Sequence, residues 1–135
     1  MIQRSQDIPK ARALFMNGNE IYESVKESKG KPRFLLLNYY AAILDYAQSL
    51  LSAEGVKITE PDHHKAAFSF IILKYPEFTP ADRTTLENLR YIRNDIQYYG
   101  TKSTKDIEEF FEYNRSGILL FISKLQRIIE NKIKR

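Results

Sequence analysis

The sequence predicts an all-α fold, an up-and-down bundle of five helices, and three observations support this prediction. Apolar residues recur at steps of three and four along most of the 135 residues. Prolines or capping residues stand where these stretches begin. The connections between them are about four to eight residues long, which suits helices packed side by side. The length corresponds to one domain, residues 1–135, large enough to bury a core.

The first helix is expected over residues 7–27. Asp7 is a suitable N-cap, and Pro9 suits the first helical turn. Gly18 stands in the middle of this helix, where glycine costs about 1 kcal/mol relative to alanine. We therefore expect Gly18 to permit a close contact with a neighbouring helix.

The second helix is expected over residues 33–52 and is apolar on nearly every side. This pattern predicts that it lies at the centre of the bundle. Asp45 is its only acidic residue, and a carboxylate in such a helix needs an ionic partner or an exposed position. Arg93 is one candidate partner, and exposure to solvent is the alternative.

Three further helices are expected over residues 61–75, 80–99 and 104–133, and Pro61 is expected to open the first of them. Asp62 favours the start of the third helix, because a carboxylate complements the positive end of the helix dipole. Thr79 is a good N-cap for the fourth, and residues 103–106 have a capping-box pattern before the fifth. We expect no sheet.

The stretch from Arg90 to Gly100, RYIRNDIQYYG, is the only dense set of arginine, amide, carboxylate and tyrosine side chains in the chain. One face of the predicted helix is apolar and consists of Leu89, Ile92, Ile96 and Tyr99. The opposite face is polar and carries Arg90, Asn94 and Gln97. Arg93 borders the apolar stripe, where its guanidinium must find acceptors or reach a cleft. Gly100 is expected to end the helix.

The order Arg-Asn-Asp-Ile-x-Tyr-Tyr-Gly, late in a small helical chain, resembles the signature helix of HEPN domains (higher eukaryotes and prokaryotes nucleotide-binding). As a helix pattern the resemblance covers most of the chain. It implies a dimeric helical bundle that acts as a metal-independent ribonuclease or as the toxin partner of a small nucleotidyltransferase. The family signature is an Arg, often followed by a polar residue, and then a His. Arg93 and Asn94 match its start, and Tyr98, or Tyr99 with a longer spacing, stands in place of the His.

RNA cleavage without a metal needs a base, an acid and a cation that holds the phosphate. Arg93 can bind phosphate oxygens in a fork, but the pKa of tyrosine, about 10, makes Tyr98 a weak base at neutral pH. The sequence therefore predicts an RNA- or nucleotide-binding HEPN relative whose catalysis is weakened or lost. Arg93 and Tyr98 are the candidate catalytic residues. The candidate binding residues are Arg90, Arg93, Asn94, Gln97 and Tyr99.

The predicted helix raises a geometric question about Arg93 and Tyr98. Five steps along an α-helix turn the chain by about 500°, so the two side chains would point about 140° apart. They can converge only if the helix unwinds near Gly100 or if two protomers build the site together.

His63 and His64 are the only side chains whose unperturbed pKa suits proton transfer near neutral pH. In an up-and-down bundle, helices two and four would end at the pole where helices three and five begin. We therefore expect His63 or His64 to face the cleft of Arg93 and to act as acid or base there. The alternative is that both are exposed residues of a helix start. A metal site is not expected, because adjacent histidines project about 100° apart on a helix.

The amino-acid composition limits the partners, cofactors and cellular location that can be expected. The net charge of +4, with both signs mixed, permits an anionic partner without requiring one. The absence of cysteine excludes disulfides and fits a cytoplasmic protein. The polar start of the chain lacks the apolar run of a signal peptide, and polar residues interrupt the apolar stretch at 34–51, so no membrane span is expected. No nucleotide-cofactor motif is present, and no cofactor is expected.

The aromatic content predicts association. Nine tyrosines and eight phenylalanines exceed what a thin bundle of this length readily buries, so we expect a symmetric homodimer. Its contact should involve the fourth helix and bring two copies of Arg93 toward one groove. Two alternatives to an RNA-binding module stay open. One is a protein-interaction module, for which the resemblance implies a nucleotidyltransferase antitoxin as the partner. The other is an active ribonuclease with a non-standard acid or base.

Overall fold

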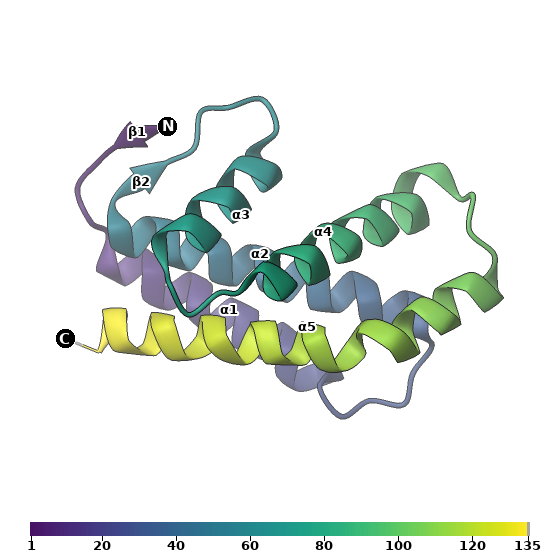
Figure 1. The fold of residues 1–135 in the computed structure, drawn as a ribbon. Helices are drawn as coiled ribbons and strands as arrows, with labels where there is room; N and C mark the ends of the chain where they lie inside the picture. Colours follow the sequence, from purple (N-terminus) through teal and green to yellow (C-terminus); the bar gives the residue numbers. More distant parts are fainter. Residues whose placement is uncertain (135) are drawn as a thin grey trace.

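The computed structural model describes residues 1–134, which form a bundle of five α-helices (Figure 1). The helices are α1 (Ile8–Val25), α2 (Pro32–Glu54), α3 (His63–Lys74), α4 (Pro80–Asn94) and α5 (Thr104–Ile133). A π-helical turn, Asp95–Tyr99, follows α4 without a break. The predicted all-α bundle is therefore confirmed. Counting the π-helical turn with α4, every predicted helix end lies within two residues of the observed one.

Side-chain caps explain where four of the five helices begin. Asp7 and Asp62 accept hydrogen bonds from the backbone N–H groups of Lys10 and Lys65, at 3.0 and 3.1 Å. Complete capping boxes precede the last two α-helices and pair Thr79 with Asp82 and Ser103 with Asp106. Each cap satisfies N–H groups that have no partner inside the helix, so local sequence sets these boundaries.

The expectation of no sheet is wrong. β1 (Ile2–Gln3) and β2 (Val56–Lys57) pair antiparallel, with Ile2 opposite Lys57. Both strands are too short to show a period-two pattern, and their partners are far apart in the sequence. Gly55 precedes β2 with φ 71°, and its carbonyl accepts from Arg4 N at 2.5 Å. A Cβ at Gly55 would collide with the Arg4 carbonyl, so only glycine fits this close approach.

The third helix runs in the same direction as α2. His64 in the first turn of α3 contacts Tyr40 in the first half of α2. At the other end, Tyr75 donates to Glu54 at the end of α2, at 2.8 Å. The segment after Gly55, anchored by the strand pair, carries the chain back along α2 and causes this direction.

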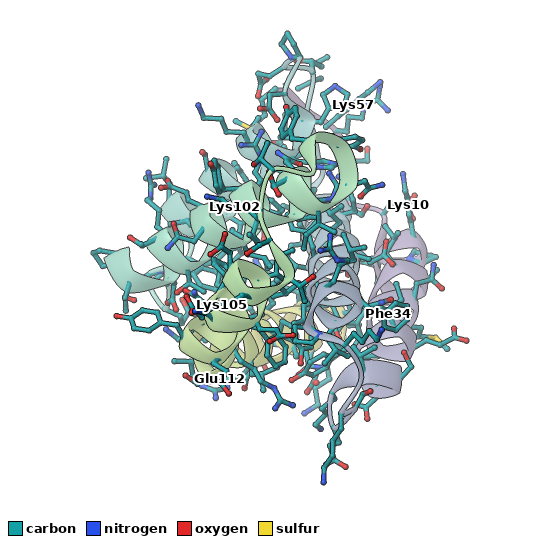
Figure 2. The ribbon with its side chains drawn as sticks, turned by 90° about the vertical axis from the view of Figure 1, so that its right-hand side faces the viewer. Lys10, Phe34, Lys57, Lys102, Lys105 and Glu112 are labelled. Carbon is teal, nitrogen blue, oxygen red and sulfur yellow. The ribbon has the colours of Figure 1, made fainter. Side chains whose placement is uncertain are left out.

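The prediction that helices two and four end at the pole where helices three and five begin is therefore wrong. The π-helical turn after α4 lies at the pole where α2 and α5 begin, whereas α2 ends at the opposite pole (Figure 1). Figure 2 looks onto the first of these poles. Phe34 of α2 lies there with Lys102 and Lys105, which flank the start of α5.

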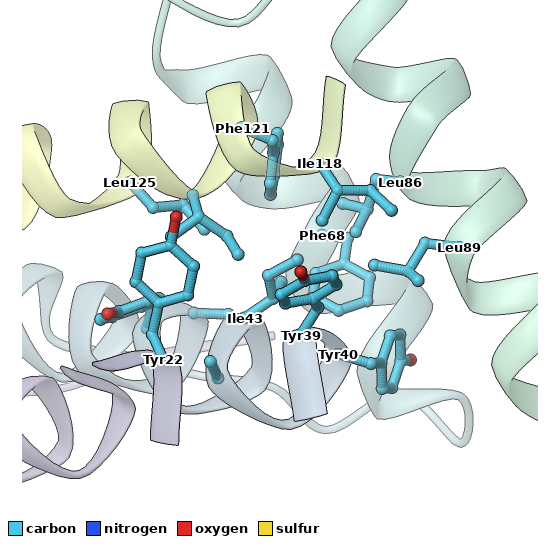
Figure 3. Packing of buried hydrophobic residues seen from close by; sticks show 14 of the residues in the cluster. Tyr22, Tyr39, Tyr40, Ile43, Phe68, Leu86, Leu89, Ile118, Phe121 and Leu125 are labelled. Carbon is cyan, nitrogen blue, oxygen red and sulfur yellow. The ribbon is translucent and has the colours of Figure 1, made fainter. Parts of the chain in front are cut away.

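The core is built around α2, as predicted, and α2 contacts each of the other four helices. Tyr39, Tyr40 and Tyr46 are at most 1% exposed, and Figure 3 shows the first two within the cluster of buried side chains. A Cβ added to Gly18 would lie 2.8 Å from the Tyr46 ring. This confirms that Gly18 permits a close contact between α1 and α2.

Asp45 has neither of the two expected environments. It is half-buried and has no ion pair among residues 1–134, so the pairing with Arg93 is wrong. Burial raises the pKa of its carboxyl group. Polar residues such as this one interrupt α2, and within residues 1–134 no helix has the length and apolar character needed to cross a bilayer.

Candidate functional site

Arg93 lies in the last turn of α4, with its guanidinium against two tyrosine rings. Its central carbon is 4.8 Å from the centre of the Tyr40 ring and 5.3 Å from that of Tyr98. One guanidinium nitrogen donates to the side-chain oxygen of Asn94 at 3.0 Å. Within residues 1–134 this guanidinium has no carboxylate partner. Aromatic faces thus hold a cation whose remaining donors are available to an anion.

The π-helical turn explains how Arg93 and Tyr98 meet in one chain. Gly100 N donates to the Asp95 carbonyl at 2.6 Å, five residues back instead of the four of an α-helix. The wider turn brings side chains five positions apart onto the same side. Gly100, with φ 63°, then ends the helix as predicted. Of the two ways in which Arg93 and Tyr98 could converge, the change of helix near Gly100 is the one observed.

Asp95 anchors the loop that leaves this turn. Its carboxylate accepts from the backbone N–H groups of Thr101 and Lys102, at 3.1 and 2.9 Å, and from the Thr101 hydroxyl. The hydrogen bond from Thr101, followed by those from the loop backbone, lowers the pKa of Asp95. Asp95 is only 4% exposed, so its carboxylate holds the turn and does not face a ligand. Sequence reasoning assigned it no such role, although an acid shortly before a helix-ending glycine is a usable signal.

The same turn moves Tyr99 out of the predicted apolar stripe. Leu89 and Ile92 are buried, and Ile96 is half-buried, as a buried stripe requires. Tyr99 is 71% exposed, because the extra residue in the turn rotates it away from the core. Its ring lies 6.4 Å from the ring of Tyr98, which is also exposed. The two tyrosines together form an exposed aromatic surface beside Arg93.

The third helix brings His64 to this site but not His63. His64 Nδ1 is 3.1 Å from the Tyr40 hydroxyl, and the imidazole centre is 5.8 Å from the Tyr40 ring centre. Arg93 contacts the same ring, so Tyr40 is a common neighbour of the imidazole and the guanidinium. His63 projects elsewhere, into a recess that Lys10 and Lys57 also line. Adjacent residues on a helix point about 100° apart, which accounts for the difference.

The environment of His64 keeps it neutral at pH 7. Burial, followed by the charges of Arg93 and Arg90, lowers the pKa of this imidazole, against a smaller opposing effect of Asp62. Arg90 forms an ion pair with Asp62, with 2.5 Å between Nη2 and Oδ2. Burial raises the pKa of Tyr40, and the two arginines oppose that rise. Tyr40 is therefore a neutral hydroxyl that links the histidine to the arginines.

Not every residue singled out from the sequence joins this site. Arg90, Arg93 and His64 lie around Tyr40, and Tyr98 and Asn94 contact Arg93. Gln97, like Tyr99, is exposed and has no hydrogen bond or ring contact with Arg93 in the described chain. Tyr40 was missed, because its ring is 1% exposed and packs in the core beside Phe68 (Figure 3). Nothing in the sequence separates it from the other core tyrosines of α2.

The site combines two arginines, a neutral imidazole and exposed tyrosine rings at the end of α4. Arginine donors can hold phosphate oxygens, and tyrosine rings can stack on a base. The fold and the site thus define a helical bundle with a cationic and aromatic surface site. Comparisons with protein-family models, with curated proteins and with solved structures found no match for this chain.

Proposed function

We propose that this protein is a HEPN-type RNA- or nucleotide-binding module whose ribonuclease activity is weakened or absent. The observation that supports it best is the environment of Arg93. Its guanidinium is held by the Tyr40 and Tyr98 rings and has no carboxylate partner in the described chain. A phosphate can take the free donors, and a base can stack on the exposed Tyr98 ring, which contributes about 1–3 kcal/mol per base in comparable sites.

The proposal of weak catalysis follows from the groups available for proton transfer. His64 is the one imidazole near Arg93, and its Nδ1 is engaged by the Tyr40 hydroxyl. Cleavage needs both a base and an acid, and a tyrosine with a pKa of about 10 is poor as the second group at neutral pH. His64 can therefore take one of the two roles but not both. Loss of one proton-transfer group typically lowers a rate by about 10²–10⁴.

The proposed working unit is a cytoplasmic homodimer that forms through α4 and the π-helical turn. Tyr91, Tyr98 and Tyr99 expose 64, 63 and 71% of their surface there, and exposed apolar groups that gather on one face can mark an interaction site. The same aromatic face supports a second candidate function, a protein-interaction module. Its partner would be the nucleotidyltransferase antitoxin that the family resemblance implies.

A binding titration tests the proposal. Fluorescence anisotropy with a labelled single-stranded RNA is expected to show affinity that falls with salt, by about 0.7 logarithmic units per phosphate contact and decade of salt. Arg93→Ala should weaken binding about tenfold or more, because it removes a charge-assisted contact. Arg93→Lys should restore it only in part, because an ammonium lacks the fork and the planar stacking face. Arg127→Ala, an exposed arginine on α5, is the matched control and should bind as the parent chain does.

The alternatives give different results. Equal affinity for Arg93→Ala and Arg127→Ala would contradict the proposed site. Absence of RNA binding, together with stable co-purification of a nucleotidyltransferase, would favour the protein-interaction module. An RNA cleavage assay in excess chelator tests the remaining alternative, an active metal-independent ribonuclease. Rapid cleavage that is lost in His64→Gln would show an active ribonuclease with His64 as its acid or base.

A further inference from the structure

A second recess lies between α3 and α4, next to the Arg93 site, and has a volume of about 360 Å³. The α3 wall carries Lys65, Ser69 and Ile72, and the α4 wall carries Arg83, Glu87 and Arg90. Each set is spaced at i, i+4 and i+7, so each forms one continuous helical face. Arg90 belongs both to this recess and to the surroundings of Tyr40.

The floor of the recess is apolar. Phe68 and Leu86 are 6 and 3% exposed and close the recess from below, and Ile72 covers one side. An apolar floor with a few polar groups at the rim is typical of a small-molecule site. A single planar heterocycle can lie on this floor, because the volume is at the small end of the range for ligand pockets, about 300–1,000 Å³.

The rim carries cations without partners. Arg83 is half-buried, and within residues 1–134 its side chain makes no hydrogen bond or ion pair. Lys65 is exposed and has no side-chain partner in the described chain either. Glu87 is the only carboxylate among the residues that line the recess. The rim therefore has a net positive charge and two cations available to an anion.

We infer that this recess binds one nucleotide, with the base on the apolar floor and the phosphate at Arg83 and Lys65. The ligand class rests on the proposed function. Because Arg90 is shared by both sites, one RNA strand can occupy them together. The Glu87 carboxylate, on the rim beside the base, accepts hydrogen bonds from the exocyclic amino groups of adenine, cytosine and guanine. Uracil lacks such a group, so the recess is expected to discriminate against it.

The test is an NMR chemical-shift titration of the full chain with ribonucleoside 5′-monophosphates. AMP and CMP should bind more tightly than UMP. Arg83→Gln should weaken AMP binding about tenfold, since it removes a charge-assisted hydrogen bond to the phosphate. Glu87→Gln should reduce the preference for AMP over UMP while both still bind. Arg127→Gln, on α5, is the matched control for loss of one arginine.

Titration of a short single-stranded RNA distinguishes a free nucleotide from one within a strand. Weaker RNA binding in both Arg83→Gln and Arg93→Ala supports one strand across both sites. AMP binding that depends on Arg83, without any RNA binding, would keep the recess as a mononucleotide site and contradict RNA binding at the Arg93 site. RNA binding that depends on Arg93, with no response to any monophosphate, would overturn the inference and leave the proposed function standing. Equal AMP affinity in Arg83→Gln and Arg127→Gln would overturn it as well.

Discussion

The guanidinium carbon of Arg93 lies 5.3 Å from the centre of the Tyr98 ring, although the two residues are five positions apart. On an α-helix their side chains would point about 140° apart. The π-helical turn at Asp95–Tyr99 removes this separation, and such turns inside helices are frequent at functional sites. A cation and an aromatic ring are thereby joined within a single chain, without a residue from a second protomer.

Glycine at position 18 is predicted to be required for the packing of α1 on α2. A Cβ there would lie 2.8 Å from the Tyr46 ring, which is fully buried and cannot move aside easily. Gly18→Ala should therefore lower the free energy of unfolding by about 1–3 kcal/mol, measured by urea denaturation. Gly117→Ala is the matched control, because its Cβ would meet only the Thr85 side chain, at 3.2 Å. Its gain in helix propensity, about 1 kcal/mol, should offset that contact. Equal stability losses in both variants would contradict the packing argument.

Glu54 is predicted to make the fold sensitive to acid. Burial would raise the pKa of its carboxyl group, but hydrogen bonds from Lys132, Lys74 and Tyr75 outweigh burial and lower it from 4.5 to about 2. Because the folded-state pKa lies below the unfolded value, the stabilisation is complete above pH 4.5 and is lost as the pH falls toward 2. The shift corresponds to about 3 kcal/mol.

Urea denaturation at pH 6 and at pH 2.5 tests this prediction. The parent chain should lose more stability between the two pH values than Glu54→Gln does. Glu23→Gln serves as the control, since Glu23 is 63% exposed and its distance to Lys26 is 3.9 Å. The same loss of stability in Glu54→Gln, the parent chain and the Glu23 variant would contradict this role of Glu54.

The pKa of His64 is predicted to reflect the position of its ring beside the arginines. The pKa of His64 should lie below 6.5, because burial and the charges of Arg93 and Arg90 disfavour its protonated form. An NMR titration of the imidazole resonances measures this, with His63→Gln used for assignment. A His64 pKa at or above 6.5 would contradict the placement of the ring beside the arginines.

The position of His64 near Arg93 also predicts how RNA binding depends on pH. As the pH falls from 7 to 5, protonation adds a positive charge near Arg93, and RNA affinity should rise a few-fold. His64→Gln should flatten this dependence, whereas His63→Gln should keep it, since His63 lines a different recess. Anisotropy titrations at the two pH values provide the measurement. An unchanged pH profile in His64→Gln would exclude the imidazole from the binding surface.

The homodimer through α4 remains a prediction of the exposed tyrosines. Light scattering should give a mass near twice the 15.9 kDa of the chain. Tyr99→Arg should shift the mass toward that of the monomer, because it places a charge in the aromatic contact. Tyr113→Arg is the control on α5, where Tyr113 is 88% exposed. A parent chain that is monomeric at high concentration would rule this contact out.

Local sequence determined the helices of this protein. The apolar period of three and four predicts all five, and the caps Asp7, Thr79 and Ser103 predict the starts of three of them, because a cap needs only residues a few positions away. The close contact at Gly18 and the helix end at Gly100 were predictable for the same reason. Arg93 could be singled out as a candidate, since a guanidinium beside an apolar stripe needs acceptors or a cleft.

Only the tertiary structure decided how these parts meet. The pairing of β1 with β2 sends α3 along α2 in the same direction, and this places His64 against Tyr40. The π-helical turn, held by the hydrogen bonds of Asp95 to the following loop, aims Tyr98 at Arg93 and turns Tyr99 to the surface. Each of these relationships depends on contacts between segments or on one extra residue in a turn. A helical period is the same whether or not those contacts form, so it determines the helices but not the site between them.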